Sequence, residues 1–235
     1  MDLIKRCGGV FFDPRRTFEG LAARPVWADT LVVVLLALIA FNLAVLPYAQ
    51  RDNLSLIRDN AALRQQMGEA TYAKLVERAE HPARSSQILQ TFVFTPLLYV
   101  AALLLQSLLL LILGRFLSTQ GSYVQALAAL VHASLIDKLL GNAVRLGLAL
   151  ARGSLMQTST SLALLFPRLE VTSTAYIVLT QFDFFQLWTF GVLAFGLSAI
   201  FKIAPKKALA LSYGVWALKA LANIGIGLIG MSFLR

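Results

Sequence analysis

Polar and ionisable side chains interrupt an otherwise apolar segment between residues 123 and 150. Its charged members include Asp137, Lys138 and Arg145. Lys138, Asn142 and Arg145 follow one another at i, i+4 and i+7, which places them on one stripe of an α-helix. Ionisable groups inside a membrane-spanning helix are costly unless they are paired or hydrated, and for that reason they are functional candidates.

A second polar stripe lies nearer the carboxyl terminus. Lys219 and Asn223 are four residues apart, so they too share one helix face. At about 1.5 Å per residue, Asp137 lies roughly 20 Å and Lys219 roughly 18 Å from the start of its helix. If both helices cross the membrane in the same direction, the two charges reach a similar depth. We therefore predict that Asp137 pairs with Lys219.

Two interpretations of these stripes remain open. In the first, the residues line a hydrated path for an ion or a polar lipid headgroup. In the second, they form a buried network that fixes helix register, with Arg145 reaching outward to the interface. Many transporters have broken helices in corresponding halves of the chain, and this sequence lacks that symmetry, so it favours the network.

The side chains needed for catalysis or metal binding are scarce. His81 and His132 are the two histidines, and neither belongs to a metal-ligand motif. Cys7 is the one cysteine, so no intramolecular disulfide can form. The sequence contains no HExxH, GxSxG, P-loop or Cys-x-x-Cys motif. We therefore predict a protein that is not an enzyme, with no catalytic residues, no metal and no cofactor.

The elements that carry these residues are predicted to be membrane-spanning helices. The chain is 58% hydrophobic and 14% charged, whereas soluble domains have about 45–50% apolar and about 25% charged residues. A helix needs about 20 apolar residues to cross a bilayer, and the charge-free runs Leu31–Leu46 and Thr91–Gly114 approach or exceed that length. The sequence therefore predicts an all-α, polytopic transmembrane helical bundle. Its expected spans are Trp27–Pro47, Thr91–Phe116, Tyr123–Leu150, Phe184–Phe201 and Lys207–Phe233.

The distribution of positive charge predicts the partners and the orientation. The formal net charge is +9, and the basic residues cluster at the ends of apolar runs. This pattern favours a membrane surface over nucleic acid, whose binding proteins gather basic residues on a soluble face. Five basic residues precede the first span, and the short turns after the second and fourth spans are also basic. We therefore predict a cytoplasmic amino terminus and an extracytoplasmic carboxyl terminus.

Residues 1–26 are predicted to form a cytoplasmic amphipathic segment. Asp13 and Pro14 are typical of a helix start, and Arg24-Pro25 is typical of a helix end. The resulting short helix could lie in the membrane interface or dock on the protein's own spans, and both remain open. Aromatic side chains near the ends of apolar runs are predicted to be interfacial anchors. These candidates are Phe18, Trp27, Tyr48, Trp188 and Trp216.

Two longer segments are predicted to lie outside the membrane on the extracytoplasmic side. In the loop 49–90, apolar residues at i, i+3, i+4 and i+7 from Tyr72 predict an amphipathic helix that closes at His81. Leu54, Ile57 and Ala61 predict an earlier helix, with Gly68 near the break. Such helices could cover the protein's own outer ends or offer a surface to a partner. The segment 153–183 is too broken for two more spans and is predicted to form an interfacial or re-entrant pair of short helices.

Three stretches of the sequence resemble the bacterial branch of the Yip family. They are FFDPRRTFEGLAARPVW (residues 11–27), QGSYVQALAALVHASL (120–135) and FDFFQLWTFGVLAFGLSAIFKIAPKKALALSYGVWALKAL (182–221). Together they cover roughly a third of the chain in the family's order. The resemblance implies a five-span helical protein with a cytoplasmic amino terminus. The loop 49–90 matches no part of that pattern.

The resemblance also sets functional expectations. Eukaryotic members of the family contact small GTPases in vesicle trafficking, but the long amino-terminal domain of those members is missing here. Some bacterial members are linked to ABC-type exporters. The expectation is therefore a single Yip-like domain over residues 1–235 in the bacterial inner membrane. It would act as a scaffold or accessory subunit for a partner membrane protein, or form a homo-oligomer. The alternative is a small transporter or lipid-handling protein that uses the polar faces of spans three and five.

Overall fold

The computed structural model of the protein describes residues 2–156 and 160–232, and within this part of the chain the secondary-structure elements are all helices. Five helical segments of the described residues are long and apolar enough to cross a membrane. The prediction of an all-α polytopic bundle with five spans is therefore confirmed. These spans are Ala28–Arg58, Arg84–Arg115, Tyr123–Arg152, Phe184–Phe201 and Pro205–Gly230. Phe233, the expected end of the fifth span, lies outside the described residues.

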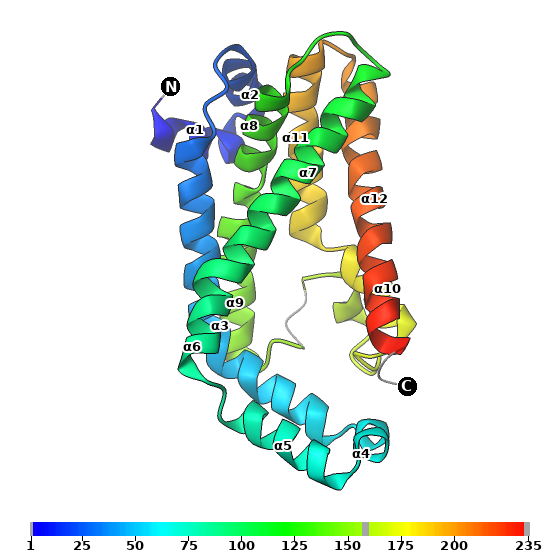
Figure 1. The fold of residues 1–235 in the computed structure, drawn as a ribbon. Helices are drawn as coiled ribbons and strands as arrows, with labels where there is room; N and C mark the ends of the chain where they lie inside the picture. The colour runs from blue at the N-terminus through cyan, green and yellow to red at the C-terminus, as the bar shows by residue number, and fades with distance from the viewer. Residues whose placement is uncertain (1, 157–159, 233–235) are drawn as a thin grey trace. The chain divides into compact units, whose positions relative to one another are not determined.

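The chain divides into two compact units. Unit 1 comprises Met1–Leu38, Pro96–Asn142 and Phe184–Leu221, and unit 2 comprises Ile39–Thr95, Ala143–Asp183 and Ala222–Arg235. In unit 1 the short helices α1 (Leu3–Phe12) and α2 (Pro14–Ala23) pack beside α8 (Tyr123–Ala133), and α2 also packs along α11 (Phe184–Phe201) (Figure 1). The amino-terminal helices are therefore an integral part of unit 1.

Helix α2 forms where the sequence predicts it, and its apolar face docks on the protein. The Asp13 side chain caps the helix by accepting from the backbone N–H of Arg16 at 3.3 Å. Phe18 and Leu21 are fully buried in the core of unit 1. Gly196 of α11 leaves room for the Phe18 ring, because an added Cβ would lie 2.9 Å from it. Of the two arrangements left open for this helix, the structure shows docking on the protein's own spans.

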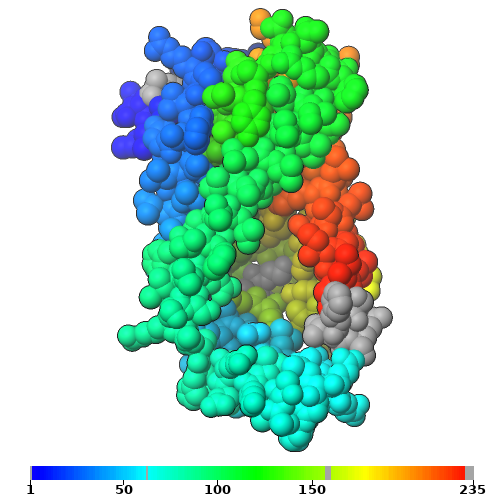
Figure 2. Space-filling view, in the orientation of Figure 1, coloured from blue at the N-terminus to red at the C-terminus, as the bar shows by residue number. Residues whose placement is uncertain are grey.

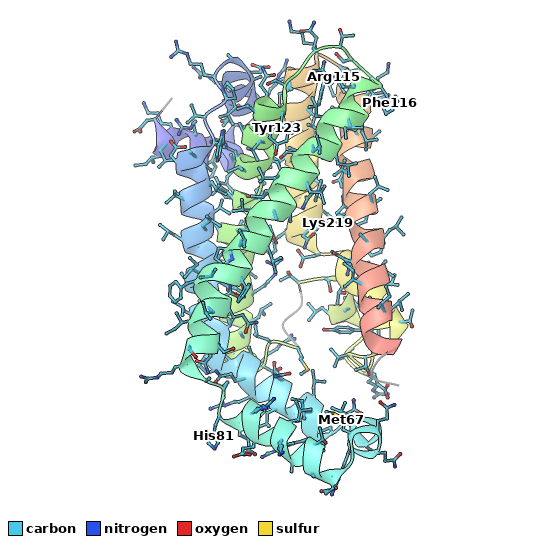
Figure 3. All side chains as sticks on the ribbon, viewed as in Figure 1. Met67, His81, Arg115, Phe116, Tyr123 and Lys219 are labelled. Carbon is cyan, nitrogen blue, oxygen red and sulfur yellow. The ribbon has the colours of Figure 1, made fainter. Side chains whose placement is uncertain are left out.

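The turn between α7 (Thr95–Arg115) and α8 is closed by hydrogen bonds at both of its ends. The Arg115 guanidinium donates to the backbone carbonyl of Thr119 and, at 2.9 Å, to that of Gly121 (Figure 3). Ser122 and Gln125 form a capping box at the start of α8. The outward side chains of α7, which crosses the face shown in green in Figure 2, are mostly leucines that remain exposed, as a lipid-facing helix requires.

The third span is not one regular α-helix. Between α8 and α9 (Asn142–Arg152), residues Ile136–Gly141 form the π-helix η2. A π-helical turn contains more residues than an α-helical turn. The spacing i, i+4, i+7 therefore does not hold one stripe across this segment, and the single stripe predicted for Lys138, Asn142 and Arg145 must be corrected for the wider turn. A second π-helix, η1 (Gln90–Phe94), joins α6 (Arg84–Leu89) to α7.

The first span is longer than predicted. Helix α3 (Ala28–Arg58) contains Pro47 in its interior instead of ending there. Proline removes one backbone hydrogen bond from a helix, but spanning helices tolerate that loss. The expected boundary at Pro47 was therefore too early. Of the residues predicted to form an earlier helix, Leu54 and Ile57 belong to the end of α3, whereas Ala61 begins α4 (Ala61–Met67).

The loop that follows α3 is helical, as predicted. Helices α4 (Ala61–Met67) and α5 (Glu69–Glu80) meet at Gly68, whose φ of +72° suits glycine. His81 caps the end of α5. An ion pair from Arg64 to Glu69, 2.8 Å long, joins the two helices, and Arg58 at the end of α3 pairs with Glu80. The loop is therefore a folded element in unit 2.

The segment 153–183 contains a pair of short helices, as predicted. They are the 3₁₀-helix η3 (Leu162–Leu165) and α10 (Thr174–Gln181). A single antiparallel bridge joins Ser161 to Asp183. Residues 157–159, which include part of the predicted Thr/Ser run, lie outside the described residues. The fifth spanning helix, α12 (Pro205–Ser232), follows α11 after a short turn.

Candidate functional site: polar side chains in the spanning helices

The wide turn η2 carries an ion pair of unit 1. The carboxylate of Asp137 and the Nζ atom of Lys138 lie 2.7 Å apart, and their side chains are 8% and 22% exposed. The Lys138 ammonium also lies over the ring of Tyr99 on α7, 5.3 Å from its centroid. A cation over an aromatic face is stabilised by the ring's electron density. This pair therefore joins the third span to α7.

Both residues of the second predicted stripe, Lys219 and Asn223, form hydrogen bonds to glutamine side chains. Lys219 on α12 donates from Nζ to the Oε1 atom of Gln186 on α11 at 2.7 Å (Figure 3). In unit 2, Asn223 donates to the Oε1 atom of Gln181 at 3.1 Å. Both partners are uncharged amides, which a search for complementary charges passes over. The pair of Asp137 with Lys219 stays a prediction.

Arg145 lies in unit 2 with a carboxylate partner. Its Nη2 atom is 2.9 Å from the Oδ1 atom of Asp183, and its Nε atom donates to the hydroxyl of Thr160 at 3.1 Å. The Thr160 hydroxyl in turn donates to Asp183. The side chains of Arg145 and Asp183 are 17% and 9% exposed. This cluster ties α9 to the segment just before α11.

A further polar chain in unit 1 was not predicted. Arg6 on α1 forms an ion pair with Asp29, and the next residue, Thr30, lies 2.9 Å from the Nε2 atom of His132. The Nδ1 atom of His132 lies 2.8 Å from the carbonyl oxygen of Ala128. Because a carbonyl can accept but not donate, Nδ1 carries a proton, and in the neutral ring Nε2 accepts from Thr30. His132 was recognised in the sequence, but the partners from the amino-terminal region were not.

The five candidate anchors differ in exposure. Phe18 is fully buried and packs within unit 1, whereas Trp27, Tyr48, Trp188 and Trp216 are half-buried. Trp188 makes edge contact with Phe11 of α1, with 6.5 Å between ring centroids. The ring of Phe18 is therefore a core contact, and the anchor role of the other four stays a prediction.

Taken together, these contacts hold helices to one another. Each charged pair joins two helices or two segments of one unit, or places a cation over a ring of a neighbouring helix. Breaking such pairs is costly in a region of low dielectric. Among the residues that the structure describes, no group of three or more His, Cys, Asp or Glu side chains could hold a metal ion.

Comparison with known proteins identifies a family. A family model described as the Yip1 domain matches residues 8–227. No curated protein and no solved structure matches the chain. The matched residues include the first four spans, most of the fifth and both polar stripes.

Proposed function

Because the chain belongs to the Yip1 domain family, we propose that this multi-pass integral membrane protein is a non-enzymatic scaffold or accessory subunit for partner membrane proteins. An ABC-type exporter is the partner class that the resemblance to bacterial members implies. The observation that supports the proposal is the helical pair α4–α5, which forms an organised surface between the first two spans.

The pair α4–α5 is built to keep its shape while remaining accessible. Tyr72 reaches back to α3, where its hydroxyl lies 3.3 Å from the carbonyl oxygens of Ile57 and Arg58. No residue of α5 is buried, and Lys74 and Arg78 are exposed one turn apart. A surface that is fixed in shape and rich in charge is suited to specific contact with another protein. Figure 2 shows α4 and α5 in cyan as a continuous surface.

The experiment is a pull-down of the full chain from its native membrane in mild detergent. The unaltered protein should bring down a membrane protein in stoichiometric amount. Lys74→Glu/Arg78→Glu should lose it, because the charge of the exposed α5 face is reversed. The matched control is Lys5→Glu/Arg16→Glu, which changes net charge equally on exposed positions of α1 and α2. Recovery of the unaltered chain alone and monodisperse would overturn the proposal.

We also propose that the chain lies in the bacterial inner membrane with its amino terminus in the cytoplasm. The basic turns that carry Arg115 and Lys206 support this orientation. A single cysteine at Gln65 or at Lys206, in a Cys7→Ser background, would be treated on intact cells with a membrane-impermeant maleimide. The cysteine at position 65 should react and that at 206 should not. The reverse pattern would invert the topology.

The alternative, a small transporter or lipid-handling protein, is favoured by one observation. The ion pair of Asp137 and Lys138 lies on a π-helix, and such turns are frequent at functional sites. Uptake or efflux by the purified chain in vesicles, lost in Asp137→Asn and retained in Lys74→Glu/Arg78→Glu, would support transport. If the purified chain transports none of the tested ions or headgroups, and a membrane protein co-purifies with it in stoichiometric amount, the transport alternative is refuted and the accessory role is supported.

A further inference from the structure

A groove with charge at one end and apolar side chains at the other opens in unit 1. It encloses about 560 Å³ between α2, α11 and α12. Its lining includes the charged side chains of Arg15, Lys202 and Lys206. It also includes Gly191, Phe195 and Leu209, which lie further along α11 and α12 from the turn that joins these helices. Phe195 and Leu209 belong to spanning helices and are 44% and 43% exposed. The groove therefore combines positive charge with apolar surface that the protein leaves uncovered.

The charged end of the groove is positive. Three cations and one carboxylate, that of Glu19, line it, which gives a formal balance of +2 (three minus one). Glu19 is engaged by Arg15, whose Nε atom lies 3.1 Å from its Oε1 atom. Within the described part of the chain, no salt bridge is formed by Lys202 or Lys206. The two lysines are thus available to an external anion.

The turn between α11 and α12 presents this charge in an unusual way. Lys202 has a φ of +51°, a left-handed conformation that glycine adopts more readily than any residue with a side chain. The chain nevertheless has a lysine there. The amino end of α12 adds partial positive charge at the same turn, whereas the carboxyl end of α11 opposes it. Because the partial charges of the two helix ends oppose each other, the charges of the two lysines make this turn attractive to an anion.

The order of the two halves matches the order of groups in a phospholipid. Lys202 follows the last residue of α11, and Gly191 lies about three turns back along that helix, or roughly 17 Å at 1.5 Å per residue. Positive charge at the end of a spanning helix lies at headgroup level, and apolar surface further along lies beside acyl chains. A soluble anion would use the charged half alone.

We propose that this groove binds one anionic glycerophospholipid. Its phosphate is held by Lys202, Lys206 and Arg15, and an acyl chain lies along Phe195 and Leu209. The site shares no residue with the polar pairs of the spans or with the α4–α5 surface. It therefore gives the protein a lipid preference of its own, whichever partner it has.

The test is native mass spectrometry of the purified full chain in a non-ionic detergent. Phosphatidylglycerol should bind with one tight site, and phosphatidylcholine with the same chains should not. Lys202→Gln/Lys206→Gln should weaken phosphatidylglycerol binding by about 30-fold, given the usual contribution of a lysine near an anionic surface. Lys74→Gln/Arg78→Gln on α5, which loses the same charge, should bind as the unaltered protein does.

Two further arms separate lipid from soluble anion and binding from folding. Dihexanoyl phosphatidylglycerol should bind more weakly than the long-chain lipid, and inorganic phosphate should not displace the latter. Lys202→Gly relieves the left-handed backbone, so it should keep its melting temperature while binding about 5-fold more weakly. Equal binding of phosphatidylcholine, displacement by phosphate, or full binding by the double lysine variant would each overturn the proposal.

Discussion

Gly114 of α7 lies against the ring of Phe201, and this contact makes a sharp test of packing in unit 1. A Cβ added at Gly114 would lie 2.3, 2.5 and 2.7 Å from three atoms of that ring. Favourable carbon–carbon contacts are about 3.5–4.0 Å long, so the closest overlap exceeds about 1 Å. Phe201 is fully buried, and a Cβ at Gly121 would also meet it, at 2.8 Å. The ring is thus confined by two glycines.

Gly114→Ala should therefore destabilise the protein by about 2–3 kcal/mol, the upper part of the usual cost of overpacking in a well-packed core. For a chain of this size that corresponds to a melting temperature roughly 5–10 °C lower. Gly214→Ala is the matched control, because Gly214 lies in α12 and a Cβ there would meet nothing within 4 Å. That change should be neutral or stabilise by up to about 1 kcal/mol, since alanine favours helix over glycine.

The assay is thermal unfolding of the full chain in one detergent, followed by circular dichroism. Phe201→Leu should cost stability by itself, yet the double variant with Gly114→Ala should lose less than the sum, because the smaller side chain makes room. The steric argument for this contact would be refuted if Gly114→Ala and Gly214→Ala had the same melting temperature. It would also be refuted if the stability loss of the double variant equalled the sum of the two single losses.

Three further predictions concern polar contacts. Asp137→Asn should cost about 3 kcal/mol, because it removes a buried carboxylate from Lys138. If Lys219→Met, added to the Asp137→Asn variant, restores its stability more than Lys138→Met does, the predicted pair of Asp137 with Lys219 is supported. The Asp52 carboxylate accepts hydrogen bonds from the backbone N–H groups of Leu155 and Met156, at 2.6 and 3.1 Å. Asp52→Ala should therefore speed amide exchange at these two groups, and unchanged exchange would contradict this. The hydrogen bond from the Arg64 guanidinium of α4 lowers the pKa of Glu69. This ion pair therefore stabilises the junction above the ordinary glutamate pKa and is lost as pH falls through the lowered one. Amide protection factors at the α4–α5 junction, corrected for the intrinsic exchange rate at each pH, should therefore fall once the pH drops below the ordinary glutamate pKa of about 4.3. A flat profile of protection factors would refute it.

The spans could be predicted because a charge-free apolar run of about 20 residues is typical of a helix that crosses a bilayer. Their ends were less predictable. Pro47 is a helix-ending signal in a soluble chain, but α3 continues past it to Arg58. In a bilayer the helix is the one local way to satisfy backbone polar groups, so losing one hydrogen bond costs less than leaving the helix. The signal that could have corrected the boundary was the apolar spacing of Leu54 and Ile57 on the same helix.

The polar residues could be found from the sequence, but most of their partners could not. Spacing along one helix shows which residues share a face, and it carries no information on which other helix that face meets. Lys219 and Asn223 are bound by amides, so a search for opposite charges misses both partners. The link from His132 to Thr30 spans 102 positions in the chain. These contacts depend on tertiary packing, which the spacing of residues along one helix does not specify.

The π-helix η2 gives a prediction that separates a widened turn from a regular one. Such a turn holds an extra residue while the helices on either side keep their direction. Deleting Leu139, which is 45% exposed, should therefore convert η2 to a regular turn and leave the faces of α8 and α9 nearly unchanged. Deleting Val144, 39% exposed in α9, removes a residue from a regular helix and rotates the remainder of α9 by roughly 100°.

The two deletions should differ in the ion pair of Arg145 with Asp183, which the rotation would separate. The Val144 deletion should lower the melting temperature markedly more than the Leu139 deletion, and in the Val144 deletion a further Asp183→Asn change should cost nothing. In the Leu139 deletion, Asp183→Asn should still destabilise the protein, because the guanidinium remains in reach. Equal melting temperatures for the two deletions would mean that η2 does not absorb the extra residue, and the predicted single stripe of Lys138, Asn142 and Arg145 would then need no correction.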